Sequence, residues 1–472
     1  MIDVIKKNPP LFLFYVISLS LCFLVFKQSD LTHTYTSSYA YLGGHLSDFY
    51  DYNKDYMMRN DYLPLMYVIF ALWSLPLKLL DLLTPADMGI EVWQTSTPLE
   101  ILWAKLLLCI FFIGCIVIIQ KITELIEPNK QPGLVNSQIL FATSPIAIFA
   151  VFIFSQYDIF GVFFTLLGIF FYFKKKFLYF AFFFSIAISF KYFACFIYLP
   201  LVLMVEKRPI HIIKYGLMGI SVTALQIGAY WHSEIFQSSF FALAGEKTGD
   251  AAYRGKAIYI AILYVLLCCY AYFSKTQLTL KEKSWPLNTI LICTLAYGLM
   301  FSLVKWHPQW ILILMPFFAL AVPFIRHQKL FISNEILAYI AFIWICVNGW
   351  KKNVDVTMLQ EGIISEYIPK LTYFGSDVLL PEGTALARVI FYFYLFSPFI
   401  FWIYENKVVM KVKIKQYFAK ARGLELPVLI GQHMASDQQI EASNLAKFYL
   451  ARIIVGGYFF LLVSLICLYF SI

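Results

Sequence analysis

Four groups of polar residues interrupt an otherwise strongly apolar chain, and together they could move a proton and hold an anion. The groups are Asp48, Asp51 and Asp61 with Tyr62; Gln156-Tyr157-Asp158; Lys191; and Lys305, His307 and Gln309. A carboxylate can accept a proton from a hydroxyl group, while lysine and histidine side chains can bind phosphate oxygens. The residue types therefore predict a site for an anionic, phosphorylated substrate next to a proton-accepting carboxylate.

Each of these residues also has a simpler explanation. Asp48 is the best candidate for a general base, yet an aspartate in a loop is about as often only solvated. Asp158 lies between two apolar runs, where a charge costs about 2.5–3.5 kcal/mol on membrane-insertion scales and usually marks function; the alternative is a helix end in the headgroup region. Lys191 could bind a phosphate oxygen or extend to the membrane surface. The tryptophans beside Lys305 and His307 could serve only as interfacial anchors.

The composition excludes a soluble domain. Of the 472 residues 61% are hydrophobic and only 14% are charged, and the mean hydropathy is +0.72, whereas soluble domains carry about 25% charged residues. Apolar runs approaching ~20 residues predict membrane-spanning helices. The net charge of +9 does not indicate nucleic-acid binding, because the lysines stand at the ends of apolar runs.

The positions that could carry chemistry must be held by the apolar runs, and these predict an all-α protein with about thirteen transmembrane helices. The runs are 10–26, 99–120, 136–155, 159–173, 177–190, 192–205, 211–231, 257–273, 287–304, 309–325, 330–349, 387–404 and 447–470. The first loop, 28–98, holds eight acidic and three basic residues, which places it outside, while every connection expected inside is basic. Within this loop, 62–83 is expected to lie on the outer membrane surface, because counting it as a span would place Lys174–Lys176 outside.

All candidate residues precede residue 325. We expect residues 1–325 to form a catalytic transmembrane module, and residues 326–472 to form a C-terminal transmembrane region with an inner basic segment at 405–446. The runs 177–190 and 192–205 are short and meet at Lys191, which predicts that a cavity or a thinned region lets this junction lie below the outer surface. We expect an integral protein of a bacterial inner or plasma membrane with an extracytoplasmic active site.

The four groups, in this order, resemble motifs of the GT-C class of integral-membrane glycosyltransferases. The likeness is to bacterial mannosyl- and glucosyltransferases related to glycolipid-anchor mannosyltransferases. It rests on Asp48-Phe49-Tyr50, Asp61-Tyr62-Leu63-Pro64-Leu65, Ser155-Gln156-Tyr157-Asp158, Lys191 and Lys305-Trp306-His307-Pro308-Gln309-Trp310. Leu63 departs from the family's DYPPL pattern, in which a proline stands at that position.

The resemblance implies an enzyme that transfers a hexose from a polyprenyl-phosphate carrier to a hydroxyl of a glycan, glycolipid or protein, with inversion. It assigns Asp48 as the general base, Lys191, Lys305 and His307 to the leaving phosphate, and Asp61, Gln156 and Asp158 to the sugar or the acceptor. Asp51, Tyr62, Tyr157 and Gln309 complete the expected substrate-binding set. No cofactor is required by these residues, although a divalent cation bridging Asp48 and Asp158 stays an option. Membrane lipids are the other expected partner.

Two other functions would also place charged groups inside a membrane. One is a transporter or flippase for a lipid-linked saccharide, which is disfavoured because the sequence shows no paired, repeat-related broken helices. The other is an envelope oligosaccharide polymerase that uses lipid-diphosphate substrates. A test for formation of a new glycosidic bond separates the transferase from the transporter.

Overall fold

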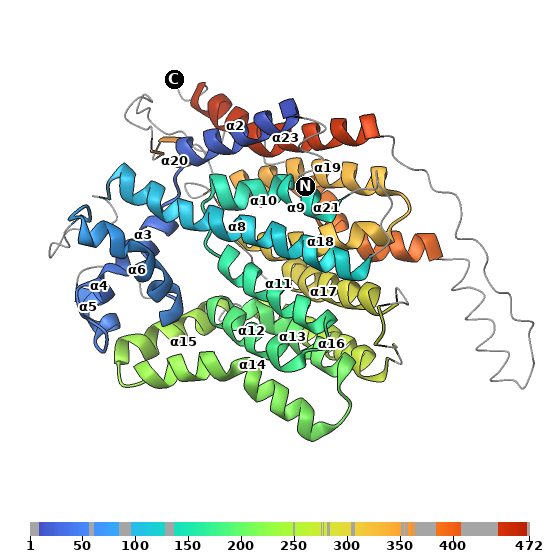
Figure 1. The fold of residues 1–472 in the computed structure, drawn as a ribbon, viewed down its shortest axis with the longest axis horizontal. Helices are drawn as coiled ribbons and strands as arrows, with labels where there is room; N and C mark the ends of the chain where they lie inside the picture. Colours follow the sequence, from blue (N-terminus) through green and yellow to red (C-terminus); the bar gives the residue numbers. More distant parts are fainter. Residues whose placement is uncertain are drawn as a thin grey trace, which may run out of the picture.

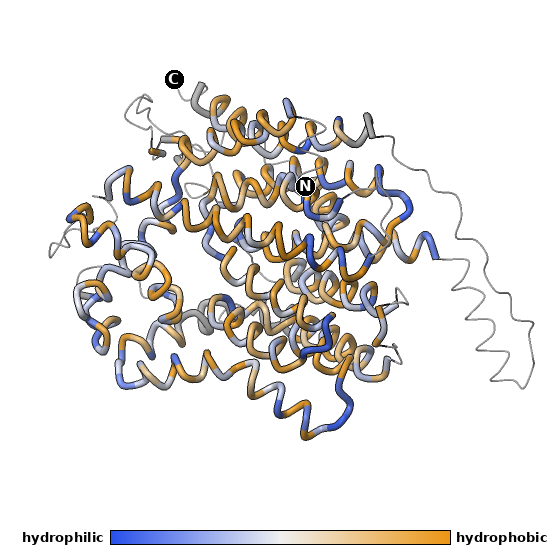
Figure 2. Tube along the Cα trace, in the orientation of Figure 1, coloured by the Kyte–Doolittle hydropathy of each residue, from blue (hydrophilic) through white to orange (hydrophobic). Residues whose placement is uncertain are grey.

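Helices make up all the regular structure in the part of the chain that the structure, a computed structural model, describes (Figure 1). Apolar residues run along most of each helix, and polar residues gather at helix ends and connections (Figure 2). The expected class, a helical membrane protein, is therefore confirmed. The described residues are 9–55, 61–84, 96–127, 136–248, 251–274, 276, 278–280, 284–303, 307–350, 354, 357–360, 362–363, 384–406 and 442–469.

Among the described residues, fewer helices are candidate membrane spans than the sequence predicts. Five helices are long and apolar enough to cross a membrane alone, and counting each of two bent pairs as one span gives seven. The five are α8 (Pro98–Ile126), α14 (Pro209–Tyr230), α17 (Ser284–Leu303), α19 (Gln328–Gly349) and α23 (Ala442–Tyr469). All the runs expected to span are helical, but the expected thirteen spans are not confirmed, because several helices are shorter than the ~20 residues that a bilayer requires.

Both bent pairs contain a sharp change of direction. Helix α2 (Pro9–Val25) meets Ser29–Leu42 at 71°, and α21 (Thr384–Leu395) meets Ser397–Asn406 at 62°. At the first bend, the buried Lys105 of α8 donates hydrogen bonds to the carbonyl oxygens of Phe23 and Phe26, at 2.5 and 2.8 Å. A lysine placed on the last carbonyls of a helix stabilises its end, and Lys105 thereby holds the bend between α2 and α3.

The first loop folds into short helices that gather beside one end of α8 (blue in Figure 1). They are α3 (Ser29–Ser37), α4 (Tyr39–Leu42), α5 (Phe49–Asp55) and α6 (Pro64–Leu79). The fully buried Glu100 of α8 accepts hydrogen bonds from the Tyr39 hydroxyl at 2.8 Å and from Thr84 and Thr97. One carboxylate therefore ties together parts of the loop that are distant in sequence. Whether α6 lies on the membrane surface stays a prediction.

Helices α11 (Ile159–Phe173) and α12 (Phe177–Phe190) pack against each other as a hairpin. Gly168 permits the close approach, since a Cβ atom there would lie 2.4 Å from the ring of Phe184. At 1.5 Å per residue each helix is about 22 Å long, which is less than the ~30 Å hydrocarbon thickness. Lys174–Lys176 stand at one end of the hairpin, and the position of its other end below the opposite membrane surface stays a prediction.

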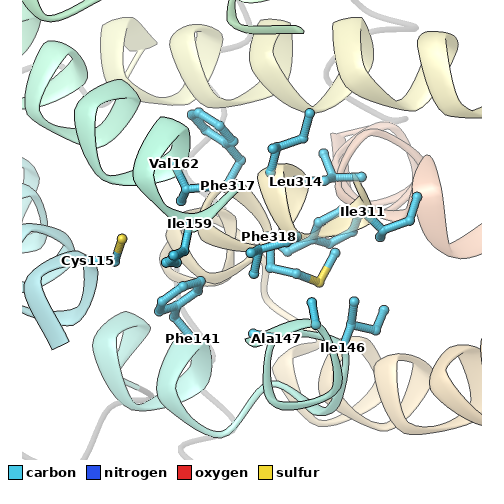
Figure 3. Packing of buried hydrophobic residues seen from close by; sticks show 14 of the residues in the cluster. Cys115, Phe141, Ile146, Ala147, Ile159, Val162, Ile311, Leu314, Phe317 and Phe318 are labelled. Atoms are coloured by element: carbon cyan, nitrogen blue, oxygen red, sulfur yellow. The ribbon is translucent and has the colours of Figure 1, made fainter. Parts of the chain in front are cut away.

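Several runs that the sequence predicts as single helices are interrupted. The expected run 136–155 is divided into α9 (Ser137–Ala142), α10 (Pro145–Ile148) and the π-helix η1 (Phe149–Ile153), and 309–325 is divided into η3 (Pro308–Leu314), α18 (Met315–Ala321) and η4 (Val322–Phe324). Figure 3 shows α8, α9, α10, α11, η3 and α18 packed around one apolar centre. The remaining described elements are η2 (Tyr192–Ala194), α13 (Cys195–Val205), α15 (Glu234–Thr248), α16 (Ala251–Phe273) and α20 (Thr357–Gln360).

A buried ion pair joins the last helices to the break between α9 and α10. Arg452 of α23, fully buried, pairs with Glu335 of α19 and donates to the Thr143 hydroxyl at 3.1 Å and the Leu140 carbonyl at 2.6 Å. The Ser144 hydroxyl donates to Glu335 at 2.7 Å. The guanidinium thus satisfies a carbonyl near the helix break, which is the condition for an interrupted helix inside a membrane protein.

Replacing Arg452 with methionine should destabilise the fold by about 3–5 kcal/mol, because Glu335 would stay buried without its cation. The double variant Arg452→Met/Glu335→Leu should recover most of the loss, since both charges are then gone. The measurement is the thermal unfolding midpoint of the protein in lipid nanodiscs. Arg388→Met, which removes an exposed arginine of α21, should leave the midpoint unchanged; equal stability of the single Arg452 variant and the wild type would contradict the structural role.

Candidate functional site

An ion pair lies at the end of the α11–α12 hairpin that is opposite Lys174–Lys176. Asp158 directly precedes α11 and Lys191 directly follows α12, so the antiparallel hairpin brings them together, with Lys191 Nζ 3.1 Å from Asp158 Oδ1. Asp158 is fully buried and Lys191 is 7% exposed. A charge pair held inside a membrane protein commonly marks a functional site, and both members were expected from the sequence.

Aromatic rings surround the lysine. The Lys191 ammonium lies 5.3 Å from the ring centre of Tyr62, 5.6 Å from that of Phe193 and 5.0 Å from that of Trp310. The faces of aromatic rings attract cations at such distances. The three rings come from the loop before α6, from η2 and from η3. These interrupted segments place aromatic side chains around the ammonium group, whereas an uninterrupted helix would direct the same side chains elsewhere.

Several buried polar atoms around this pair lack hydrogen-bond partners among the described residues. They are Ser155 Oγ, Gln156 Oε1 and Nε2, Asp158 Oδ1 and Oδ2, and Gln309 Oε1. The contact of Asp158 with Lys191 is an ion pair without hydrogen-bond geometry, so both carboxylate oxygens keep their capacity to accept. A buried polar group without a partner costs about 1–3 kcal/mol. Ser155, Gln156 and Asp158 lie close together in the chain, and Gln309 directly precedes Trp310, whose ring lies near Lys191, so these atoms are candidates for binding a ligand. We call Ser155, Gln156, Asp158, Lys191 and Gln309 the polar cluster.

The backbone before α11 has an unusual conformation at Ser155. Ser155 has a φ of 61°, in the left-handed region that non-glycine residues rarely adopt. It follows η1, and η1 and α11 both pack against η3, which carries Gln309. Strain of this kind is typical of functional sites. The same short stretch thereby supplies the Ser155, Gln156 and Asp158 side chains of the polar cluster.

Tyr157 supports the cluster from the loop side. Its hydroxyl lies 2.9 Å from the Thr34 hydroxyl and donates to Asp30 Oδ2 at 3.2 Å, and its ring meets that of Tyr62 edge-on at 5.3 Å. Because the hydroxyl is already hydrogen-bonded and the residue is fully buried, Tyr157 connects α3 to the polar cluster. Its expected role in binding substrate stays a prediction.

Asp48, the expected general base, lies outside the polar cluster. Its side chain is 55% exposed, and Oδ2 is 2.9 Å from His45 Nδ1. The hydrogen bond from His45 holds the pKa of this carboxyl below its usual range. Asp48 is connected to the cluster through the next residues of the chain, since the Tyr50 hydroxyl donates to the backbone oxygen of Tyr62 at 2.7 Å. It remains ionised at neutral pH and open to solvent.

The other expected residues divide between the rim and the loop. His307 is exposed, and its ring centre lies 4.8 Å from that of Trp310, which places it at the edge of the cluster. Asp51 accepts a hydrogen bond from Ser233 at 3.0 Å, and Asp61 is exposed next to Tyr62. Lys305 lies outside the described residues.

Three residues near the site were missed or given another role at the level of sequence. The His45 partner of Asp48 is three residues away, a spacing that could have suggested the contact. Phe193 and Trp310 lie beside Lys191; at the level of sequence, anchoring at the membrane surface was one alternative for Trp310. In the part of the chain that the structure covers, no three His, Cys, Asp or Glu side chains are grouped to hold a metal ion, and metal independence stays a prediction.

Replacing Lys191 with methionine should destabilise the protein by about 3–5 kcal/mol, because Asp158 would remain buried and unpaired. The double variant Asp158→Asn/Lys191→Met should regain most of that stability. Lys174→Met, at the exposed end of the same hairpin, is the matched control and should behave as the wild type. Thermal unfolding in nanodiscs measures the difference, and a Lys191 variant as stable as the control would show that the pair is not held in the interior.

Comparison with known proteins identifies no relative of this chain. No family model matches it, and neither a curated protein nor a solved structure matches it. A function has to be inferred from the chemistry of the polar cluster and of the loop beside it.

Proposed function

We propose that the protein is a membrane glycosyltransferase that moves a hexose from a polyprenyl-phosphate carrier to an acceptor hydroxyl on the extracytoplasmic side. The observation that carries the proposal is the polar cluster, with its buried Asp158–Lys191 pair, next to a loop that presents the ionised, exposed Asp48. The cluster lies at the hairpin end opposite Lys174–Lys176, and lysines of short connections prefer the cytoplasmic side. This supports an extracytoplasmic site.

In the proposed reaction Asp48 accepts the proton of the acceptor hydroxyl. The oxygen then attacks the anomeric carbon, the bond from that carbon to the carrier phosphate breaks, and the phosphate leaves with the bonding electron pair. A single displacement inverts the configuration. His307 at the rim, and Lys305 by its place in the sequence, are assigned to the leaving phosphate, where cations stabilise the developing negative charge. The acceptor is a glycan, glycolipid or protein.

Transport of a lipid-linked saccharide is the second candidate, because one observation favours it. The sequence shows no sign of broken helices, yet the structure interrupts the chain at η1 and η3, next to the buried ion pair. Interrupted helices beside a buried polar site are typical of transporters. The two candidates differ in one measurable product, the new glycosidic bond.

Asp48→Asn should lower the transfer rate by about 100-fold or more, the usual contribution of a general base. The assay combines purified protein in nanodiscs, a polyprenyl-phosphate hexose and an acceptor, with mass spectrometry of the product. Asp81→Asn is the control, since Asp81 is another exposed aspartate of the same loop and its φ of 52° suits asparagine. Full activity of the Asp48 variant would remove Asp48 as base; movement of sugar across the membrane without a new bond would favour the transporter.

The acidic limb of the pH–rate profile should lie below the ordinary aspartate pKa of about 3.9, because His45 stabilises the ionised form of Asp48. His45→Phe keeps a ring to stack on Tyr52, now 3.7 Å from the His45 ring, but removes the hydrogen bond. The pKa of Asp48 then rises, so activity should be lost at a higher pH than in the wild type. An unchanged acidic limb in kcat/KM would show that the base is another group.

A further inference from the structure

We propose that the first turns of α14 bind an acidic phospholipid, in the membrane leaflet on the side of Lys174–Lys176. The site is a surface groove of about 490 Å³, which we call the α14 groove. The side chains that line it are Ile210, His211, Ile213, Lys214, Leu217 and Met218. This site lies apart from the polar cluster, and the proposal does not depend on the proposed function.

The apolar wall of the α14 groove is uncovered by other described parts of the chain. Helix α14 lies at the edge of the molecule (Figure 1) and is long and apolar enough to cross a membrane. Ile210 is 70% exposed, Ile213 57% and Leu217 62%. Exposed apolar residues continue to Leu225, about three turns and 16 Å beyond Lys214. That distance is about half of the ~30 Å hydrocarbon thickness, so the stripe matches one acyl chain in one leaflet.

Lys214 supplies the charge that selects an anionic headgroup. It is exposed and has neither a hydrogen bond nor an ion pair among the described residues. Glu206, the only acidic residue between positions 200 and 230, already pairs with Arg208 at 2.9 Å and lies 3.9 Å from His211 Nδ1. The positive charge of Lys214 is therefore left unbalanced beside an apolar wall.

Helices α12 and α14 run in the same direction, which brings more cations to this end of the molecule. The Ser185 hydroxyl accepts from the Val222 amide at 2.9 Å, and four residues later the Ser189 hydroxyl lies 3.1 Å from that of Thr223. Lys174–Lys176 directly precede α12 and so stand at the same end as the start of α14. Lysines in such connections favour the cytoplasmic side.

The other neighbours of the α14 groove add no negative charge in the described part of the chain. Lys207 donates to the Ala271 carbonyl of α16 at 3.0 Å, and its ammonium lies 5.3 Å from the Tyr272 ring centre. The sequences of α12, α13, α14 and α16 contain no acidic residue. Part of the connection that follows α16 lies outside the described residues, and its sequence has more basic than acidic residues: Lys275, Lys281, Glu282 and Lys283.

An acidic phospholipid matches both halves of the α14 groove. Lysines close to a membrane surface attract anionic headgroups, and a lysine can extend its ammonium to headgroup depth while its stem stays among apolar chains. A free anion would use the charge and leave the apolar wall uncovered. A second copy of the chain, packed symmetrically through this face, would place Lys214 against Lys214, and like charges repel.

The test counts and ranks lipids bound to the full-length protein by native mass spectrometry. Phosphatidylglycerol and phosphatidylcholine with the same acyl chains are titrated into the purified protein, and the wild type should hold phosphatidylglycerol more tightly. Lys214→Met should lower that affinity about five-fold, the usual contribution of one lysine at an anionic membrane surface, and leave phosphatidylcholine binding unchanged. Because Lys214 is exposed and unpaired among the described residues, the unfolding midpoint should not change.

Lys329→Met is the matched control. Lys329 is an exposed lysine near the start of α19, another helix long and apolar enough to cross a membrane, and it does not line the α14 groove. This variant should hold phosphatidylglycerol as the wild type does. Glycerol phosphate, which has the charged group without acyl chains, should not displace the lipid at equal concentration.

Four results would overturn the proposal. They are equal phosphatidylglycerol affinity in the Lys214 and Lys329 variants, equal affinity of the wild type for the two lipids, displacement of the lipid by glycerol phosphate, and a dimer that forms as lipid is lost. The third would identify the ligand as a free phosphate compound, and the fourth would identify the α14 groove as an interface between copies of the chain.

Discussion

The arrangement of the candidate site depends on the buried ion pair between Asp158 and Lys191. Neither charge is tolerated alone in an apolar interior, so the ends of α11 and α12 have to stay together. The short length of these two helices follows the same constraint, because longer ones would carry the charges past each other or into the headgroup region. The polar cluster holds buried oxygens and amides without hydrogen-bond partners among the described residues, and aromatic rings surround its lysine.

Placing the polar cluster inside a membrane protein requires interrupted helices. A continuous helix satisfies its own backbone, whereas the break between α9 and α10 leaves carbonyl groups that need other partners. The structure supplies one from a distant part of the chain, since Arg452 donates to the Leu140 carbonyl. Gly456 permits a second close approach, between α23 and α10. A Cβ atom at this position would lie 2.8 Å from Pro145 Cα and would keep the two helices apart.

These contacts bear on how the chain is organised. Residues 326–472 carry none of the expected site residues, but Glu335 and Arg452 hold the break between α9 and α10, from which η1 leads to Ser155 and Asp158. The C-terminal region therefore supports the segment that carries the polar cluster. The division at residue 325 stays a prediction, and the two parts share at least this buried network.

The sequence by itself determined the class of protein, because a helix that crosses a lipid bilayer must be both long and apolar, and composition records this directly. It also singled out Asp158 and Lys191, since a charge in an apolar run is costly and therefore conspicuous. Helix boundaries at 159–173 and 177–190 follow from the lysines between them and agree with the structure. Asp48 was equally conspicuous, but the sequence placed it with the other groups, whereas the structure leaves it exposed beside His45.

Only the tertiary structure decided which of these residues meet and what they can bind. Sequence patterns cannot show that Lys191 is already neutralised by Asp158, or that Gln156 and Gln309 keep unsatisfied atoms, because pairing depends on contacts between distant segments. The breaks within 136–155 and 309–325 were also invisible, since their residues are as apolar as those of a continuous helix. At the break between α9 and α10 the partner, Arg452, lies 312 residues from Leu140. The pairing of Lys191 with Asp158, at 3.1 Å, follows from that packing alone.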